Sequence, residues 1–301
     1  MNEENFVDYL AKLFHRRSDV GIGPGDDAAV LDLGIPGTLL LAAADQVIEN
    51  IHYLPETPIG KVARKLLNRN ISDIAAMGGV PTHALVTLAS NPLNMDMLKA
   101  FHEALGDEAR KYNVSIIGGD IAANPVKGSV ISLTILGTVL RKNLCLRSNA
   151  CAGDLLYCTG EFGNSFPGDH HLEFVPRLRE SQFLAGFFSS AMIDVSDGLL
   201  KDASRMAHAS KLAVVFHDPA SIPARNHATL QQAFCDGEDY ELIFAVPPGK
   251  AEELERKAVE KQIKITRIGY FKKGKHGTAW DGNGNPIQFD DAEGYDHFHE
   301  K

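Results

Sequence analysis

Apolar runs alternate with polar and glycine-rich breaks along the chain, and their spacing predicts helices and strands in turn. Phe6, Leu10, Leu13 and Phe14 follow helical spacing, which predicts an amphipathic helix over residues 3–16. Further helices are expected over residues 59–77, 94–112, 197–209 and 248–262. Strands are expected over residues 28–31, 38–44, 84–88, 114–117, 129–139, 154–159, 212–216, 242–246 and 264–271. This alternation predicts an α/β protein with mixed α+β sheets.

The chain length adds a prediction of two domains. A chain of 301 residues has enough material for two hydrophobic cores. The irregular, polar segment over residues 140–149 is the best place for a boundary, so we expect domains at 1–148 and 149–301.

Charge and cysteine usage exclude several classes of protein. The net charge of −9, without any lysine or arginine run, argues against a nucleic-acid partner. The four cysteines form no C-x-x-C pair, so neither a zinc site nor a disulfide framework is indicated. The first residues lack a signal-peptide pattern, and no apolar run is long enough to span a membrane. We therefore expect a cytoplasmic protein with no membrane partner.

Asp73 is the most informative single position. It lies in the predicted helix 59–77, in a small and apolar segment that ends in Gly78-Gly79. A carboxylate on such a closely packed surface is expensive to bury unless it is paired or holds a cation. An ion pair with Arg64 or Arg69 is the structural alternative.

The same pattern recurs, because other acidic residues also follow or precede glycine, alanine, serine or short apolar runs. They are Asp26, Asp27, Asp45, Asp120, Asp194 and Asp197. Several carboxylates without a P-loop lysine motif favour phosphates held through Mg²⁺, which prefers oxygen ligands. In phosphoryl transfer the protein mainly positions the reactants and neutralises charge. If the adjacent Asp26 and Asp27 are counted as one, these residues and Asp73 form six acidic sites, and a glycosidase carboxylate pair would leave four of them without a role.

Other polar positions have both a functional and a structural interpretation. His52 could contact a ligand, or it could be a partly exposed loop residue. Ser196 could contact a ligand, or it could cap the helix that follows. Glu238 belongs to a dense acidic cluster that is unusual before a buried strand. The histidine pair at 170–171 is expected at the surface. Tyr295 could cover a ligand or dock the terminus.

Several longer motifs now stand out in order along the chain. They are Gly25-Asp26-Asp27-Ala28, Asp45 through His52-Tyr53, Ser72-Asp73-Ile74-Ala75-Ala76-Met77-Gly78, Gly118-Gly119-Asp120, Arg147-Ser148, Asp194-Val195-Ser196-Asp197-Gly198-Leu199, and Gly237-Glu238-Asp239-Tyr240-Glu241. Together they resemble thiamine-monophosphate kinases, a family of the aminoimidazole-ribonucleotide synthase-like ATP-binding superfamily. The chain departs from the family's pattern beside Asp45, where threonines are usual and Ala44 and Gln46 stand here.

The resemblance implies transfer of the ATP γ-phosphate to thiamine monophosphate, with Mg²⁺ between the substrates, in a homodimer. It implies metal ligands at Asp26, Asp27, Asp45, Asp73, Asp120 and Asp194. It implies ATP contacts at Gly119, Asp120 and Arg147. It implies substrate contacts at His52, Ser196, Asp197, Glu238 and Tyr295, with Asp73 and Asp197 as the catalytic residues.

Two other functions stay open at this point. A related ATP-dependent enzyme of the same superfamily could act on another small substrate. A binding protein could keep the scaffold and sense a thiamine phosphate without consuming ATP.

Overall fold

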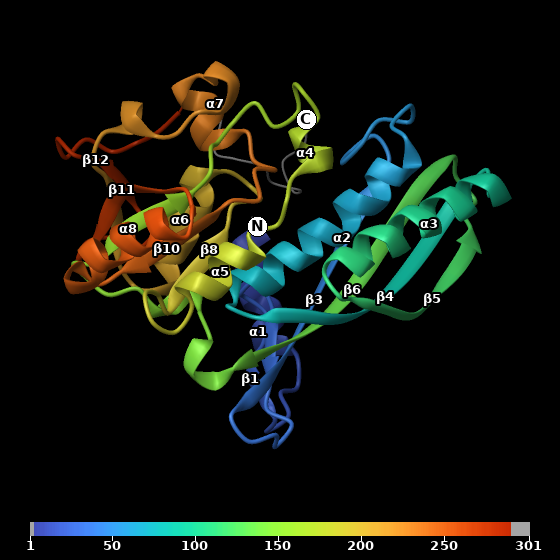
Figure 1. Ribbon diagram of the computed structural model, residues 1–301, viewed down its shortest axis with the longest axis horizontal. Coiled ribbons are helices and arrows are strands. Elements are labelled where there is room, and N and C mark those ends of the chain that lie inside the picture. Colours follow the sequence, from blue (N-terminus) through green and yellow to red (C-terminus); the bar gives the residue numbers. More distant parts are fainter. Residues whose placement is uncertain (1–2, 290–301) are drawn as a thin grey trace.

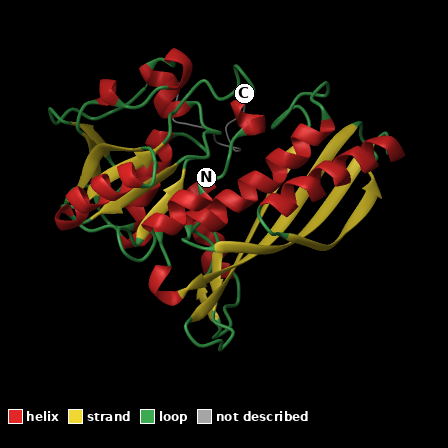
Figure 2. Cartoon of the chain, in the orientation of Figure 1, coloured by secondary structure: helices red, strands yellow, loops and turns green. Residues whose placement is uncertain are grey.

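The computed structural model describes residues 3–289, which form two sheets of six strands each. The sheets lie at opposite ends of the molecule, and helix α2 (Ile59–Ala76) runs between them (Figure 1). Helices and strands alternate in both halves, as Figure 2 shows by colour. Within these residues, no helix combines the length and the apolar character that crossing a membrane requires.

The N-terminal sheet has the strand order β1-β2-β3-β6-β4-β5. Its strands are β1 (Val20–Ile22), β2 (Ala29–Leu31), β3 (Thr38–Ile48), β4 (Val80–Asn91), β5 (Ser115–Ala123) and β6 (Gly128–Leu140). All neighbours are antiparallel except β4 and β5. Helix α2 and helix α3 (Met95–Lys111) pack on one face, while helix α1 (Glu3–Leu13) precedes the sheet.

Burial alternates along the strands of this sheet because only one face packs on these helices. In β4, Ala84 and Val86 are buried against the helices, whereas the alternating residues Leu85 and Thr87 are exposed. The sheet therefore carries a half-solvated face with apolar residues on it.

The C-terminal sheet has the order β12-β9-β11-β7-β10-β8. Its strands are β7 (Leu155–Thr159), β8 (Ala191–Asp194), β9 (Ala213–Phe216), β10 (Leu242–Val246), β11 (Ile265–Lys272) and β12 (Ala279–Asp281). Its helices are α4 (His170–Glu173), α5 (Leu178–Leu184), α6 (Leu199–Ala209), α7 (Leu230–Cys235) and α8 (Ala251–Glu260). Strands β7 to β10 are buried throughout because separate apolar clusters cover both faces.

Helix α2 joins the two halves. Its apolar side chains, such as Leu66 and Ile71, are fully buried in the N-terminal core. Its last turn contacts the C-terminal half, where the Ser181 hydroxyl donates a 2.5 Å hydrogen bond to the Ala75 carbonyl. The helix stops at Gly78, which has a φ of 72° and would strike the Asn143 carbonyl if it carried a Cβ.

Most predicted elements are confirmed, but three segments differ from the predictions. Strand β3 does not end before Asp45 and runs on to Ile48 beside β6. Gly118-Gly119-Asp120 does not follow a strand, because β5 continues through it to Ala123. Residues 20–22, for which no strand is predicted, form β1 against β2.

Candidate active site and metal centre

Three carboxylates converge at the junction of the two halves. Asp27 lies in the loop between β1 and β2, Asp73 near the end of α2, and Asp194 at the end of β8. Their oxygen atoms lie within 4.8 Å of one another. Asp194 is 3% exposed, and the side chain of Asp27 is 1% exposed. Such a set of oxygen donors matches what a divalent cation such as Mg²⁺ prefers.

The electrostatics of this group also favour a cation. Burial raises the pKa of Asp73 well above its usual range, and the charges of Asp45, Asp194 and Asp27 raise it further. Burial and the charge of Asp27 do the same to Asp194. Within residues 3–289, the Asp73 carboxylate accepts no hydrogen bond and forms no ion pair, so the expected alternative, pairing with Arg64 or Arg69, is wrong.

Neighbouring residues hold the carboxylates in place. The Ser72 hydroxyl donates a 2.6 Å hydrogen bond to Oδ2 of Asp194. The buried Asn70 side chain accepts from the backbone N–H of Asp45 at 3.1 Å and donates to the Leu66 carbonyl. Both residues come from α2, so one helix orients acids that belong to three different elements.

Arg147 binds the acidic pair before β2. Its Nη2 lies 2.6 Å from Oδ1 of Asp27, and its backbone N–H donates to Oδ2 of Asp26 at 3.3 Å. Burial raises the pKa of Asp26 to about 7, the charge of Asp27 adds to this, and Arg147 opposes it. The predicted ATP residue Arg147 therefore lies beside the carboxylate group.

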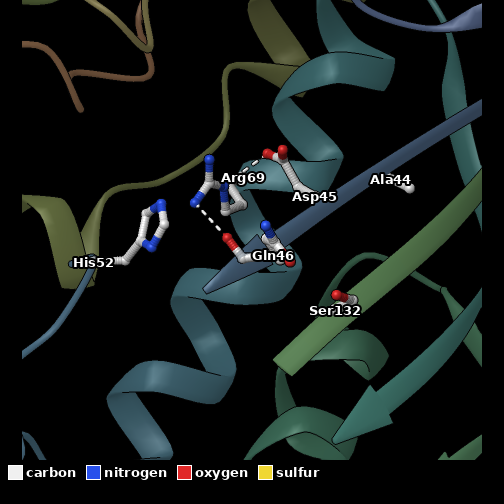
Figure 3. A pocket seen from close by; sticks show the side chains of 6 residues that line it. All are labelled: Ala44, Asp45, Gln46, His52, Arg69 and Ser132. Atoms are coloured by element: carbon white, nitrogen blue, oxygen red, sulfur yellow. Dashed lines mark hydrogen bonds and ion pairs between the residues drawn. The ribbon is translucent and has the colours of Figure 1, made fainter. Parts of the chain in front are cut away.

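A cavity of about 350 Å³ opens next to β3. It is lined by Ala44, Asp45, Gln46, His52, Arg69 and Ser132 (Figure 3). Arg69 projects from α2, and its Nε lies 2.7 Å from Oδ2 of Asp45. Its Nη1 donates to the Gln46 carbonyl at 2.8 Å. Asp45 thus pairs with an arginine, and it is not a member of the three-carboxylate group.

A second, narrower cavity collects the predicted substrate residues. It is lined by Ile51, His52, Arg69, Phe166, Ser196, Asp197, Asp236, Glu238 and Tyr240. Asp197 is ion-paired with Arg205 at 2.7 Å and with Lys201 at 3.3 Å. Ser196 does not cap α6, because Gly198 occupies the N-cap position. Tyr295 lies outside the described residues.

Sequence analysis did not single out Lys65 or Tyr240, and it considered Arg69 only as a partner of Asp73. Lys65 is fully buried, donates to the His52 carbonyl at 2.7 Å and pairs with Glu238. Burial lowers the pKa of Lys65. The available signal was a lysine directly before Leu66-Leu67 on the predicted helix, since a lysine buried with such residues needs a partner.

Gly119 and Asp120 lie apart from this site within the single chain. Across the sheet, Asp45 pairs with Leu133, Leu133 with Val86, and Val86 with Gly119. Three strand spacings separate Asp45 from Gly119, which is about 14 Å. Their roles toward ATP and metal stay predictions.

His170 and His171 do not form the expected surface pair. His171 is buried, with its ring against Phe166 at a centroid distance of 4.6 Å. The Nε2 atom of His170 lies 3.0 Å from the Asp239 carbonyl.

Comparisons with known proteins agree with this architecture. The profile of the AIR synthase related protein N-terminal domain matches residues 25–139, and that of the C-terminal domain matches residues 153–282. The thiamine-monophosphate kinase of Rhodopirellula baltica is 35% identical, over 89% of this chain and 88% of the relative. That of Escherichia coli strain K12 is 31% identical, over 96% of each chain. The chain belongs to the thiamine-monophosphate kinase family.

The three-dimensional structure of the chain also resembles a solved structure. The solved structure of AaThiL complexed with AMPPCP and TMP matches with a TM-score of 0.82 at 22% identity, covering 99% of this chain and 97% of that one. The predicted two-domain α/β fold and the resemblance to thiamine-monophosphate kinases are thus confirmed.

Proposed function

We propose that this chain transfers the γ-phosphate of ATP to thiamine monophosphate and releases thiamine diphosphate. The observation that carries the proposal is the convergence of Asp27, Asp73 and Asp194 beside the cavity with His52 and Glu238. Relatives that match nearly the whole chain are thiamine-monophosphate kinases, and AaThiL was solved with AMPPCP and TMP.

Asp27, Asp73 and Asp194 would hold Mg²⁺ in this proposal. The partnerless Asp73 carboxylate supports the fit, because a carboxylate repelled by two others is stabilised by a cation. When bound, Mg²⁺ would neutralise charge on the transferred phosphate and its neighbours. Asp26, Asp45 and Asp120 stay in the proposal as further metal-site residues.

The chain's own side chains have separate parts in the transfer. Arg147 is suited to phosphate oxygens of ATP, since a guanidinium can bind them through two hydrogen bonds. Asp236 and Glu238, with the Phe166 and Tyr240 rings, form a wall that suits a thiazolium cation. The acceptor phosphate is already ionised at neutral pH, so direct in-line transfer needs no strong general base.

The homodimer belongs to the same proposal. Leu85 is 40% exposed on β4, and Ile117 and Ile121 on the edge strand β5 are 54% and 48% exposed. An edge strand beside exposed apolar side chains is a surface that natural proteins usually cover. A dimer contact there would include Gly119 and Asp120. We also propose a cytoplasmic location and domains at 1–148 and 149–301.

Incubation of the pure protein with Mg-ATP and thiamine monophosphate tests the proposal. We expect thiamine diphosphate, separated from substrate and detected as its fluorescent thiochrome, only when Mg²⁺ is present. ATP binding without this product would instead indicate a related enzyme with another acceptor. Binding of thiamine monophosphate without any ATP consumption would indicate a non-catalytic binding protein.

A further inference from the structure

Arg69 occupies the junction of the two cavities. It is the one lysine or arginine among the described residues that line them, and it lines both. Arg69 precedes Asp73 by four residues on α2, so both project from the same face of the helix, about 6 Å apart along its axis. A ligand group held by Arg69 would therefore lie next to the three-carboxylate group.

The guanidinium of Arg69 is fixed in position but retains unused donors. Its side chain is 12% exposed, and Nε and Nη1 are held by Asp45 and the Gln46 carbonyl (Figure 3). Within residues 3–289, Nη2 donates to no protein group. A guanidinium carries five N–H donors in a planar fork, so part of this fork remains available for a ligand.

A buried hydroxyl beside Arg69 also lacks a partner. Tyr240 lines the second cavity and is 2% exposed, and its hydroxyl makes no hydrogen bond within the described part of the chain. The ring is fixed by stacking on Phe174 at a centroid distance of 3.9 Å. Leaving a buried hydroxyl unpaired is unfavourable, so its place in the cavity indicates a polar ligand group.

The charged side chains that line the second cavity indicate where an anionic ligand group can bind. Asp197, Asp236 and Glu238 line it and would repel an anion, while Lys65 is already engaged by Glu238 and the His52 carbonyl. An anionic group is therefore favoured only at the end where Arg69 lies.

We infer that Arg69, together with the Tyr240 hydroxyl, binds the phosphate of thiamine monophosphate and directs it toward the metal carboxylates. This inference rests on the proposed function. It adds a phosphate-binding residue supplied by the chain itself. Asp45 keeps the guanidinium in position through Oδ2.

Calorimetric titration without Mg²⁺ or ATP separates this role from a structural one. Thiamine and thiamine monophosphate are each titrated into the wild type, Arg69→Gln, Tyr240→Phe and Arg64→Gln. Arg69→Gln should weaken binding of the monophosphate about tenfold or more and leave thiamine binding within about twofold, because a charge-assisted hydrogen bond to phosphate is lost. Tyr240→Phe should weaken monophosphate binding about threefold to tenfold.

Arg64→Gln is the matched control, since it removes one positive charge from the same helix outside both cavities. It should behave as the wild type. An equal loss for both ligands in Arg69→Gln would show a structural role and overturn the inference. If Arg69→Gln fails to fold, Tyr240→Phe decides, and unchanged discrimination there also overturns it. A wild type that binds thiamine no more weakly than thiamine monophosphate also overturns the inference, whereas the proposed function is tested separately by the product assay with Mg-ATP.

Discussion

The Ser72 hydroxyl donates a 2.6 Å hydrogen bond to Oδ2 of Asp194, and this bond joins the N-terminal half to the C-terminal half at the metal centre. Ser72 is 1% exposed and Asp194 is 3% exposed, so water does not compete for the bond. Ser72 directly precedes Asp73 on α2, and the helix therefore supplies one carboxylate and orients another.

Replacing Ser72 with alanine should weaken Mg²⁺ binding about tenfold to 100-fold, because residues that orient metal ligands have effects of this size. The free energy of unfolding should fall by about 1–3 kcal/mol from the loss of a hydrogen bond to a buried carboxylate. Ser90→Ala is the control, since Ser90 is buried and bonds Ser129 away from the site. Equal Mg²⁺ affinity in both variants, measured by calorimetry, would contradict the role of Ser72.

Asp73→Asn should lower turnover about 100-fold or more, because one ligand of the charge-neutralising metal is lost. The metal-free protein should melt at the same temperature or higher. Burial, and next the charges of Asp45, Asp194 and Asp27, raise the pKa of Asp73 because they disfavour its charged form, and asparagine removes that charge. Asp32→Asn, at an exposed ion pair with Arg141, should leave both quantities unchanged. Near-normal turnover in Asp73→Asn would remove it from the mechanism.

Mg²⁺ binding should release protons and strengthen as the pH rises. Burial and neighbouring carboxylates raise the pKa values of Asp73 and Asp194, so these groups bind protons more tightly than ordinary carboxyl groups, and a metal competes with those protons. The pKa of about 7 for Asp26 places part of this change between pH 6 and 8. The dissociation constant should fall by up to about tenfold per pH unit for each proton displaced. Titrations in buffers of different ionisation enthalpy measure this release, and a pH-independent affinity would contradict it.

His171 should make the protein less stable as the pH falls. Burial, and next the charge of Lys65, lower the pKa of His171 from 6.5 to about 3 in the folded protein. The unfolded chain then binds more protons below pH 6.5, so the stability present above that value is lost progressively toward pH 3. The loss is about 1 kcal/mol at one pH unit below 6.5.

Chemical denaturation of His171→Gln at several pH values tests this effect. The difference from the wild type should shrink as the pH falls from 7 to 5. His276→Gln, at an exposed histidine, should follow the wild-type profile. Parallel profiles for the wild type and His171→Gln would mean that His171 binds protons equally in the folded and unfolded protein, which would contradict this effect.

Leu85→Asp should convert the proposed dimer to a monomer, because a carboxylate would be buried in an apolar contact. Sedimentation equilibrium measures the mass of the particle. Val259→Asp is the matched control, since Val259 is 79% exposed on α8, away from this sheet. A wild-type particle with the mass of one chain, or a dimeric Leu85→Asp, would contradict the proposed contact.

Local sequence patterns predicted the secondary structure and part of the metal centre. Helix α2 and strand β10 follow from apolar periodicity, and Asp73 stands out because an acid in that setting needs compensation. The lengths of β3 and β5 were underestimated, because pairing with β6 and β4 overrides the glycines and polar residues within them.

The ion-pair partners of residues that are distant in the sequence could not be predicted from local patterns. Arg69 pairs with Asp45 of strand β3, whereas Asp73 was the acid considered as its partner. Lys65 pairs with Glu238, which lies more than 170 positions later in the chain. Such pairs depend on how a helix meets a sheet or the other half of the molecule, which local periodicity does not encode.

The metal carboxylates come from both sides of the domain junction, with Asp27 and Asp73 on one side and Asp194 on the other. The like charges of these carboxylates disfavour close contact between the two halves unless protons or cations neutralise them. A cation bound by all three carboxylates would replace this repulsion with attraction, and would link the two halves directly. In the proposed function, the ion that neutralises the phosphates would therefore also draw the two halves together when the site is loaded.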